Sequence, residues 1–217
     1  MTALEQIGRD WGWRIERREN LARLTAAMER GESIVVYQDV GRSDWCDSFD
    51  SPVNFQRVQT WPPQGDWAGA LVISDLLLPG LDPCPTVVYR PPTLVLGIGC
   101  RSGTPAADVE AMFQDVCREH GFAPLSVGLI ATAATKVGEP GLIEFAARQG
   151  IPLRGFSLEE LASVPNLPTP SLKVKEKLGI RGVAEPAALL GTGYGRLVMF
   201  KQQLERITMA LARREDA

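Results

Sequence analysis

The stretch from Thr93 to Thr104, TLVLGIGCRSGT, constrains the fold of this chain more than any other. Aliphatic and β-branched residues lead into three glycines and an arginine, and Pro105 follows, where a helix would begin. The pattern predicts a strand, a glycine loop and a helix start. A loop in this place exposes backbone N–H groups at the positive end of a helix dipole. We therefore expect it to bind an anion.

Two other interpretations of the glycines stay open. Gly97, Gly99 and Gly103 resemble a dinucleotide loop, but their spacing is GxGxxxG. The next predicted strand, Ser126–Ile130, is followed by no ribose-binding acid, which disfavours a nicotinamide or flavin. The glycines also suit a tight turn without any ligand. Arg101 favours a binding role, because a cation beside converging N–H groups suits a carboxylate or a phosphate.

The composition excludes several classes of protein. The chain has 217 residues, 45% of them hydrophobic and 23% charged, with a net charge of -3. Such a balance is ordinary for a soluble protein and gives no basic excess for nucleic acid. The N-terminus MTALEQIGRDWGW lacks the features of a signal peptide, and no apolar run approaches membrane length. We expect a cytoplasmic protein without nucleic-acid or membrane partners.

The cysteines and the one histidine disfavour metal and triad chemistry. Cys46, Cys84, Cys100 and Cys117 lack CxxC spacing, so neither a disulfide framework nor a zinc site is expected. His120 lies near the end of a predicted helix, where C-terminal carbonyls would be its partners. A Ser-His-Asp or Cys-His mechanism would have to use this histidine, so we expect no triad and no protein-bound metal.

The first half of the chain, 1–91, predicts a small α/β domain. Residues 38–65 are too long for a simple connection, and they form either a lid over a ligand or a surface excursion whose aromatic residues pack on the sheet. Prolines at 83, 85, 91 and 92 break the chain, and we place a domain boundary after residue 91. The predicted elements are helices ending near 10 and spanning 20–31, and strands within 11–17 and at 33–37, 70–74 and 86–89.

The second half, 92–217, predicts another α/β domain with a mixed sheet and helices on both faces. Two strands near the C-terminus are separated by so few residues that they should form an antiparallel hairpin. The capping box of Ser157 and Glu160 starts a brief helix. Besides the glycine-loop strand, the predicted strands are 126–130, 151–156, 196–202 and 207–212, and the other helices are 104–121, 139–150, 172–178 and 183–190.

A second polar loop, ATAATKVGEPG, follows the strand 126–130. If that strand is a parallel neighbour of the glycine-loop strand, both loops open into one crevice, as in other open α/β sheets. We therefore expect Arg101, Thr132, Lys136 and Glu139 to lie together. Glu139 is a candidate general base, although acidic residues in the first turn of a helix more commonly serve the helix dipole.

Several motifs resemble the cobalamin biosynthesis protein G family, the cobalt-precorrin-5A hydrolases. GIGCRSGT, TAATKVGEPGLIEFA, RGVAEPAALL and the closing FKQ and ITMALAR resemble its C-terminal domain and the related cobalamin biosynthesis protein E. That resemblance covers roughly Pro92 to Arg213. GWRIE, GESIVVYQ, ALVIS and VVYRPP resemble the middle region of the family. Full-length members carry a further N-terminal domain, which nothing in this sequence resembles.

The resemblance implies that the chain opens the ring A δ-lactone of a cobalt-containing corrin precursor and releases acetaldehyde. It also implies that cobalt enters only within the substrate, so no cofactor is expected. The ring is rimmed with carboxylates, which require cationic or N–H anchors. Glu139 would be the base. The substrate would be bound by Gly97, Gly99, Cys100, Arg101, Ser102, Gly103, Thr104, Thr132, Lys136 and Lys201.

Two alternatives to catalysis stay open at this point. The chain is either a corrin-binding carrier that presents an intermediate to another enzyme of the pathway, such as a precorrin methyltransferase, or an interaction module with purely structural loops. The missing N-terminal domain and the absence of a strong acid/base pair make the carrier a serious rival to the enzyme, which stays the first hypothesis.

Overall fold

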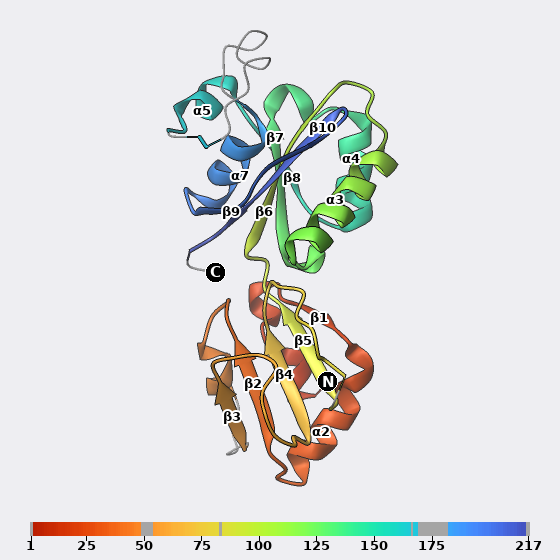
Figure 1. Cartoon of the computed structure of the whole chain (residues 1–217), viewed down its shortest axis with the longest axis vertical. Helices are drawn as coiled ribbons and strands as arrows, with labels where there is room; N and C mark the ends of the chain where they lie inside the picture. The colour runs from red at the N-terminus through yellow and green to blue at the C-terminus, as the bar shows by residue number, and fades with distance from the viewer. Residues whose placement is uncertain (1, 49–53, 83, 166, 169–181, 216–217) are drawn as a thin grey trace. The chain divides into compact units, whose positions relative to one another are not determined.

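The computed structural model describes residues 2–48, 54–82, 84–165, 167–168 and 182–215 (Figure 1). These residues form two compact units, each with its own five-stranded sheet. The first unit contains the chain up to Pro92 together with Gly121–Ser126. The second contains Thr93–His120 and Val127–Glu215. The α/β class predicted from the sequence is confirmed, while the helix predicted at 172–178 lies outside the described residues.

The first unit has a mixed sheet with the strand order β1-β5-β4-β2-β3. The strands β5, β4, β2 and β3 are parallel neighbours, and β1 is antiparallel to β5. Its elements are α1 (Ala3–Gln6), the 3₁₀ turns η1 (Arg9–Trp11), η2 (Arg18–Asn20) and η3 (Asp44–Ser48), α2 (Leu21–Glu29), β1 (Arg14–Glu16), β2 (Ile34–Gln38), β3 (Phe55–Val58), β4 (Gly69–Ile73) and β5 (Thr86–Arg90).

The long segment after β2 packs on its sheet where the structure describes it. The side-chain amide of Gln38 donates to the carbonyls of Val40, Gly41 and Arg42 at 2.9 to 3.1 Å. Its oxygen accepts from the indole N–H of Trp45 at 2.8 Å, and Trp45 is buried. The segment therefore matches the packed excursion better than a lid.

Sequence analysis missed the edge strand β3 in that segment. All four of its residues are exposed or half-buried, so it lacks the apolar run that marks a strand. Asparagine before a helix predicts an N-cap at Asn20, and this prediction is also wrong: the Asn20 side chain makes no cap hydrogen bond and donates instead to the Thr86 carbonyl at 2.9 Å. Asn20 is buried beside β5, so its side-chain amide needs a hydrogen-bond partner within the protein, and the Thr86 carbonyl is that partner.

The second unit has the strand order β8-β7-β6-β10-β9. Figure 1 shows α3 and α4 against one face of this sheet and α5 and α7 against the other. The mixed sheet and the closing antiparallel hairpin of β9 and β10 are confirmed. Its elements are β6 (Leu94–Cys100), α3 (Ala106–His120), β7 (Val127–Ala133), the 3₁₀ turn η5 (Ala134–Lys136), α4 (Pro140–Gln149), β8 (Leu153–Phe156), α5 (Leu158–Ser163), α7 (Ala184–Thr192), β9 (Arg196–Leu204) and β10 (Ile207–Arg213). The 3₁₀ turn η4 (Pro124–Ser126) precedes β7 and belongs to the first unit.

The glycine strand β6 is longer than the sequence suggests. It continues to Cys100, so Gly97 and Gly99 lie inside the sheet rather than in a loop. Gly97 is paired with Ala210 of β10 and Ala131 of β7. The glycine loop is therefore reduced to the residues after Cys100.

The inward face of α4 also differs from the prediction at one position. The apolar spacing of Leu142, Ile143 and Ala146 predicts that all three face the core, but Ile143 is 50% exposed. The buried face carries Leu142, Phe145 and Ala146, and Phe145 contacts Phe113 of α3 edge to face at 5.4 Å between ring centroids. Ile143 lies off this face because neighbouring helical positions are rotated by about 100°.

Candidate functional site

The loops that follow β6 and β7 lie side by side, as the sequence predicts. The two strands are parallel neighbours, so both loops leave the same edge of the sheet. The ammonium of Lys136 donates to the Ser102 hydroxyl at 2.7 Å. The backbone N–H of Gly103 donates to Glu139 Oε2 at 3.1 Å. Two of the four residues expected to converge, Lys136 and Glu139, therefore contact the loop after β6.

Glu139 joins the two loops as an ion pair. Its Oε1 accepts from Lys136 Nζ at 2.8 Å, and the two side chains are only 17% and 22% exposed. Hydrogen bonding from Lys136, and then from the Ser102 hydroxyl and the Gly103 amide, lowers the pKa of Glu139 to about 2. Both carboxylate oxygens are occupied, and so low a pKa makes a weak base near neutral pH. Its role as general base stays a prediction.

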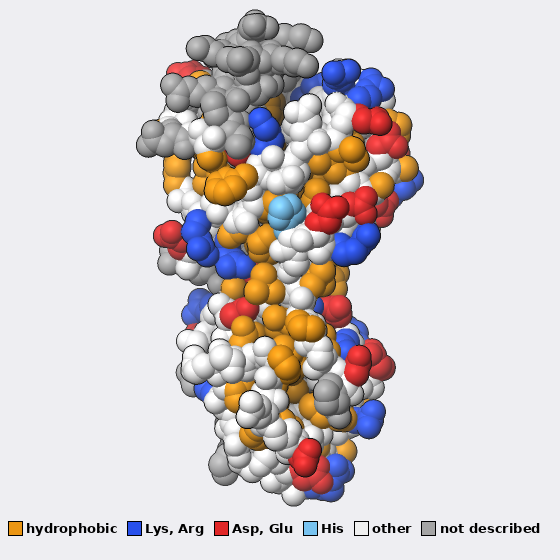
Figure 2. All heavy atoms as spheres, viewed as in Figure 1, with side chains coloured by type: hydrophobic (Ala, Val, Ile, Leu, Met, Phe, Trp, Pro, Cys, Tyr) orange, Lys and Arg blue, Asp and Glu red, His pale blue; other side chains and the backbone are white. Residues whose placement is uncertain are grey.

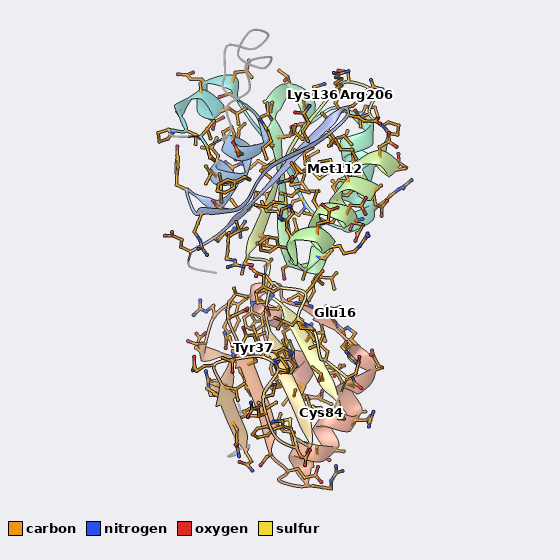
Figure 3. The ribbon with its side chains drawn as sticks, viewed as in Figure 1. Glu16, Tyr37, Cys84, Met112, Lys136 and Arg206 are labelled. Carbon is orange, nitrogen blue, oxygen red and sulfur yellow. The ribbon has the colours of Figure 1, made fainter. Side chains whose placement is uncertain are left out.

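Two arginines border the loop after β6. Arg101 is exposed, and its guanidinium has no hydrogen-bond or ion-pair partner in the part of the chain that the structure describes. Its backbone N–H donates to the carbonyl of Arg206 at 3.0 Å. Arg206 lies in the β9–β10 turn and donates from Nη2 to the carbonyl of Ser102 at 3.1 Å. Figure 3 shows Lys136 and Arg206 at the same end of this unit, where basic side chains gather in Figure 2.

Sequence analysis missed Arg206. The only signal available was its place in the predicted hairpin turn, and the sequence does not reveal which strand that hairpin pairs with. In the structure β10 pairs with β6, so the turn lies beside the loop that holds Arg101. The pairing of β10 with β6 is therefore what places Arg206 beside the candidate site.

Three predicted site residues lie inside the sheet. A Cβ atom at Gly97 would be 1.9 Å from the Ala184 carbonyl oxygen, and one at Gly99 would be 2.6 Å from Thr208 Oγ1, so both glycines permit close packing. Thr132 is fully buried in β7, and its hydroxyl donates to the Ile98 carbonyl at 2.7 Å. These contacts give all three residues structural roles.

Of the remaining predicted residues, Thr104 and Cys100 lie next to the loop after β6, and Lys201 lies on another strand. Thr104 is buried, and its hydroxyl donates to the Arg101 carbonyl at 2.7 Å, which closes the loop. Cys100 is half-buried at the end of β6, and burial raises the pKa of its thiol. Lys201 belongs to β9, which β10 separates from β6, and its backbone N–H donates to Glu185 Oε1 at 3.1 Å.

A shallow hollow adjoins the loop after β6. It has a volume of about 370 Å³ and lies between the first turns of α3 and α4, lined in part by Gly103, Pro105, Pro140 and Arg148. No group of three or more His, Cys, Asp or Glu side chains that could hold a metal ion occurs in the described ranges. Among the helices of the described residues, none has the length and apolar character to cross a membrane.

Comparison with protein families matches nearly the whole chain. Residues 2–91 match the family described as cobalamin biosynthesis central region. Residues 94–212 match the family described as cobalamin synthesis G C-terminus. The resemblance stated from the motifs is therefore confirmed over both units.

Individual proteins show the same likeness. A cobalt-precorrin-5A hydrolase of Priestia megaterium is 31% identical over 96% of this chain and 57% of its own length. Protein CobE of Sinorhizobium sp is 36% identical over 46% of this chain and 66% of its own length. The chain thus spans little more than half of that hydrolase.

A solved structure supports the fold of the second unit. The crystal structure of CobE, described as a protein from the cobalamin (vitamin B12) biosynthetic pathway, is 33% identical, with a TM-score of 0.53. The match covers 56% of this chain and 89% of that one. The chain therefore belongs to the cobalamin biosynthesis protein G family.

Proposed function

We propose that this chain binds a cobalt-precorrin intermediate at the loops after β6 and β7. The supporting observation is that three cationic side chains lie at the exposed loop 101–103. Arg101 belongs to this loop, and Lys136 and Arg206 both donate hydrogen bonds to Ser102. A corrin precursor carries acetate and propionate groups on its rim, and guanidinium and ammonium groups bind carboxylates strongly. The hollow adjoins Gly103 at the edge of these loops, so it would take a peripheral substituent while the ring lies across the loops.

The reaction that we propose is opening of the ring A lactone of cobalt-precorrin-5A with release of acetaldehyde. Attack of water on the lactone carbonyl develops negative charge on its oxygen, which N–H donors stabilise, and the ester C–O bond then breaks to give a carboxylate and an alcohol. The alcohol carbon leaves as acetaldehyde when its C–C bond to the ring breaks, and the macrocycle takes up the electron pair and a proton. The N–H groups of Arg101 and Gly103 are already bonded within the protein. The N–H of Ser102 has no partner within the described ranges, so it is the donor left for such an oxygen.

A second candidate function is carriage of the intermediate without catalysis. Two observations favour it. Glu139, with a pKa of about 2 and both oxygens bonded, is poorly suited to activate water. The solved CobE chain, which is matched over 89% of its length by about half of this chain, shows that a similar unit exists as a separate protein. A carrier would present the pigment to another enzyme, such as a precorrin methyltransferase.

One incubation separates the two functions. The purified chain is mixed anaerobically with cobalt-precorrin-5A, and acetaldehyde is measured together with the visible spectrum of the pigment. Acetaldehyde released in proportion to enzyme and time supports the hydrolase. A saturable spectral shift without acetaldehyde supports the carrier. An unchanged spectrum and no acetaldehyde contradict both.

Arg101→Ala tests whether the loops are the binding site. It should weaken pigment binding about tenfold or more, because one charge-assisted hydrogen bond contributes roughly 1.5–3 kcal/mol. Arg118→Ala is the control, since Arg118 is an exposed arginine of the same unit that is already paired with Asp115. Equal weakening by both variants would show a general charge effect rather than a site.

A further inference from the structure

The position between the two loops is already filled by a carboxylate of the protein. Lys136 uses two of its three ammonium donors on Ser102 Oγ and Glu139 Oε1. The Gly103 N–H bonds the other oxygen of Glu139. A ligand carboxylate would find only the third ammonium donor open, and a fuller contact with Lys136 would require it to displace Glu139 from a half-buried ion pair. Lys136 is therefore a poor choice for the main anchor, although it carries the charge expected from the sequence.

The two arginines on the other side of the loop are available. Cys100 of β6 pairs with Ile207 of β10. Arg101 follows Cys100 and Arg206 precedes Ile207, so the two arginines are neighbours across the adjacent strands. Both are exposed, and neither has a carboxylate partner within the described residues, including Glu205 in the same turn. Two other exposed arginines of the unit, Arg118 and Arg148, are by contrast paired with carboxylates.

Charge and geometry both favour an anion between these two side chains. Like charges on neighbouring strands repel, and a bound anion removes that repulsion. A guanidinium has five N–H donors in a planar fork that matches the two oxygens of a carboxylate. Arg206 spends one donor on the Ser102 carbonyl, which orients its guanidinium over the loop and leaves the other donors for a ligand.

We propose that Arg206 and Arg101 jointly bind one peripheral carboxylate of the corrin ring, and that Lys136 and Glu139 instead form a clamp that fixes the loop. This inference rests on the proposed function, because it assigns the anchor within the same site. Arg206 is thereby a ligand-binding residue, and the Lys136–Glu139 ion pair is a positioning element.

The test uses a stable corrin with free carboxylates. Cobyrinic acid is titrated into the full chain and followed by visible absorbance, with cobinamide, whose side chains are amides, as the matched ligand. Arg206→Ala should raise the Kd for cobyrinic acid about tenfold or more. Binding of cobinamide should be weaker and should not change with this variant. Arg206→Lys, which keeps the charge but loses the fork, should recover only part of the affinity.

The same hairpin provides a control variant. Arg196 is exposed and lacks a carboxylate partner in the described part of the chain, but it lies at the opposite end of β9, where it pairs with Arg213. Arg196→Ala removes the same charge from the same hairpin, and its Kd should stay within about twofold of wild type, because separated exposed charges are screened by salt.

The outcomes distinguish this inference from the proposed function. If the unaltered chain binds neither cobyrinic acid nor cobalt-precorrin-5A, the proposed function fails. If it binds the pigment and Arg206→Ala binds equally well, only the inference is overturned. A double-mutant cycle tests the shared carboxylate: Arg101→Ala and Arg206→Ala should lose less together than the sum of their separate effects. Strict additivity would mean that they hold different groups.

Discussion

Gly97 of β6 lies directly against the carbonyl oxygen of Ala184, the first residue of α7. A Cβ atom at this glycine would be 1.9 Å from that oxygen and 2.8 Å from the backbone nitrogen of Ala188. Both atoms belong to the helix backbone and cannot rotate away. The absence of a side chain therefore allows α7 to pack on the centre of the sheet, which in turn fixes the strand that ends at the candidate site.

Gly97→Ala should destabilise the protein by about 2 kcal/mol or more, because overpacking a tight contact with backbone atoms costs roughly 1–3 kcal/mol. Urea unfolding followed by far-UV circular dichroism measures the change. Gly138→Ala is the control, since a Cβ there meets nothing within 4 Å. Its stability should stay within about 0.5 kcal/mol of wild type. Equal stability of the two variants would contradict the close approach of α7.

Local patterns predicted most elements of both sheets and the meeting of two loops. The apolar runs at Val35 and Leu71 and the periodicity around Phe113 are strong signals, because each element buries one continuous face. The convergence of Lys136 and Glu139 on the glycine loop followed from the rule that neighbouring parallel strands share an edge.

What the sequence did not reveal depends on contacts between distant segments. The sequence does not distinguish a glycine that permits close packing within a strand from one that belongs to a loop. Gly97 is of the first kind, because it lies against the backbone of Ala184. Arg206 lies beside the site because β10 pairs with β6, and no local sequence pattern predicts that strand order. Thr132 appeared polar enough for a loop, but the strand continues through it and buries its hydroxyl.

Thr132→Val separates a structural role from a binding role. The variant removes the hydrogen bond to the buried Ile98 carbonyl and keeps a side chain of similar shape, so stability should fall by about 1 kcal/mol. The Kd for cobyrinic acid should not change. A variant of wild-type stability that binds the pigment more weakly would return Thr132 to the ligand site.

Gln38→Ala tests whether the segment after β2 is held in place by one amide. The variant removes three hydrogen bonds to the carbonyls of residues 40–42 and the hydrogen bond that the indole N–H of Trp45 donates to Gln38. Each such hydrogen bond contributes about 0.5–1.5 kcal/mol, so the first unit should unfold at lower urea. Tryptophan fluorescence reports the change directly. Gln59→Ala, at an exposed glutamine after β3, should leave the unfolding curve unchanged.

The ion pair of Glu139 with Lys136 should make stability depend on pH in a defined window. The folded state lowers the pKa of Glu139 from its ordinary value of 4.5 to about 2. Between these values the unfolded chain binds the proton and the folded chain does not. The stabilisation from Glu139 is therefore complete above pH 4.5 and is lost as the pH falls toward 2. Glu139→Gln should be less stable than wild type at pH 6, and this difference should shrink at pH 3.

Urea unfolding of both proteins at the two pH values measures that difference. Glu119→Gln is the control, because it removes an exposed carboxylate of α3 that has no hydrogen-bond partner in the described part of the chain. Its difference from wild type should be small at both pH values. A Glu139→Gln variant that is as stable as wild type at pH 6 would mean that the carboxylate does not clamp the loops. Glu139 would then be a stronger candidate for the base, since a carboxylate free of Lys136 can take a proton from water.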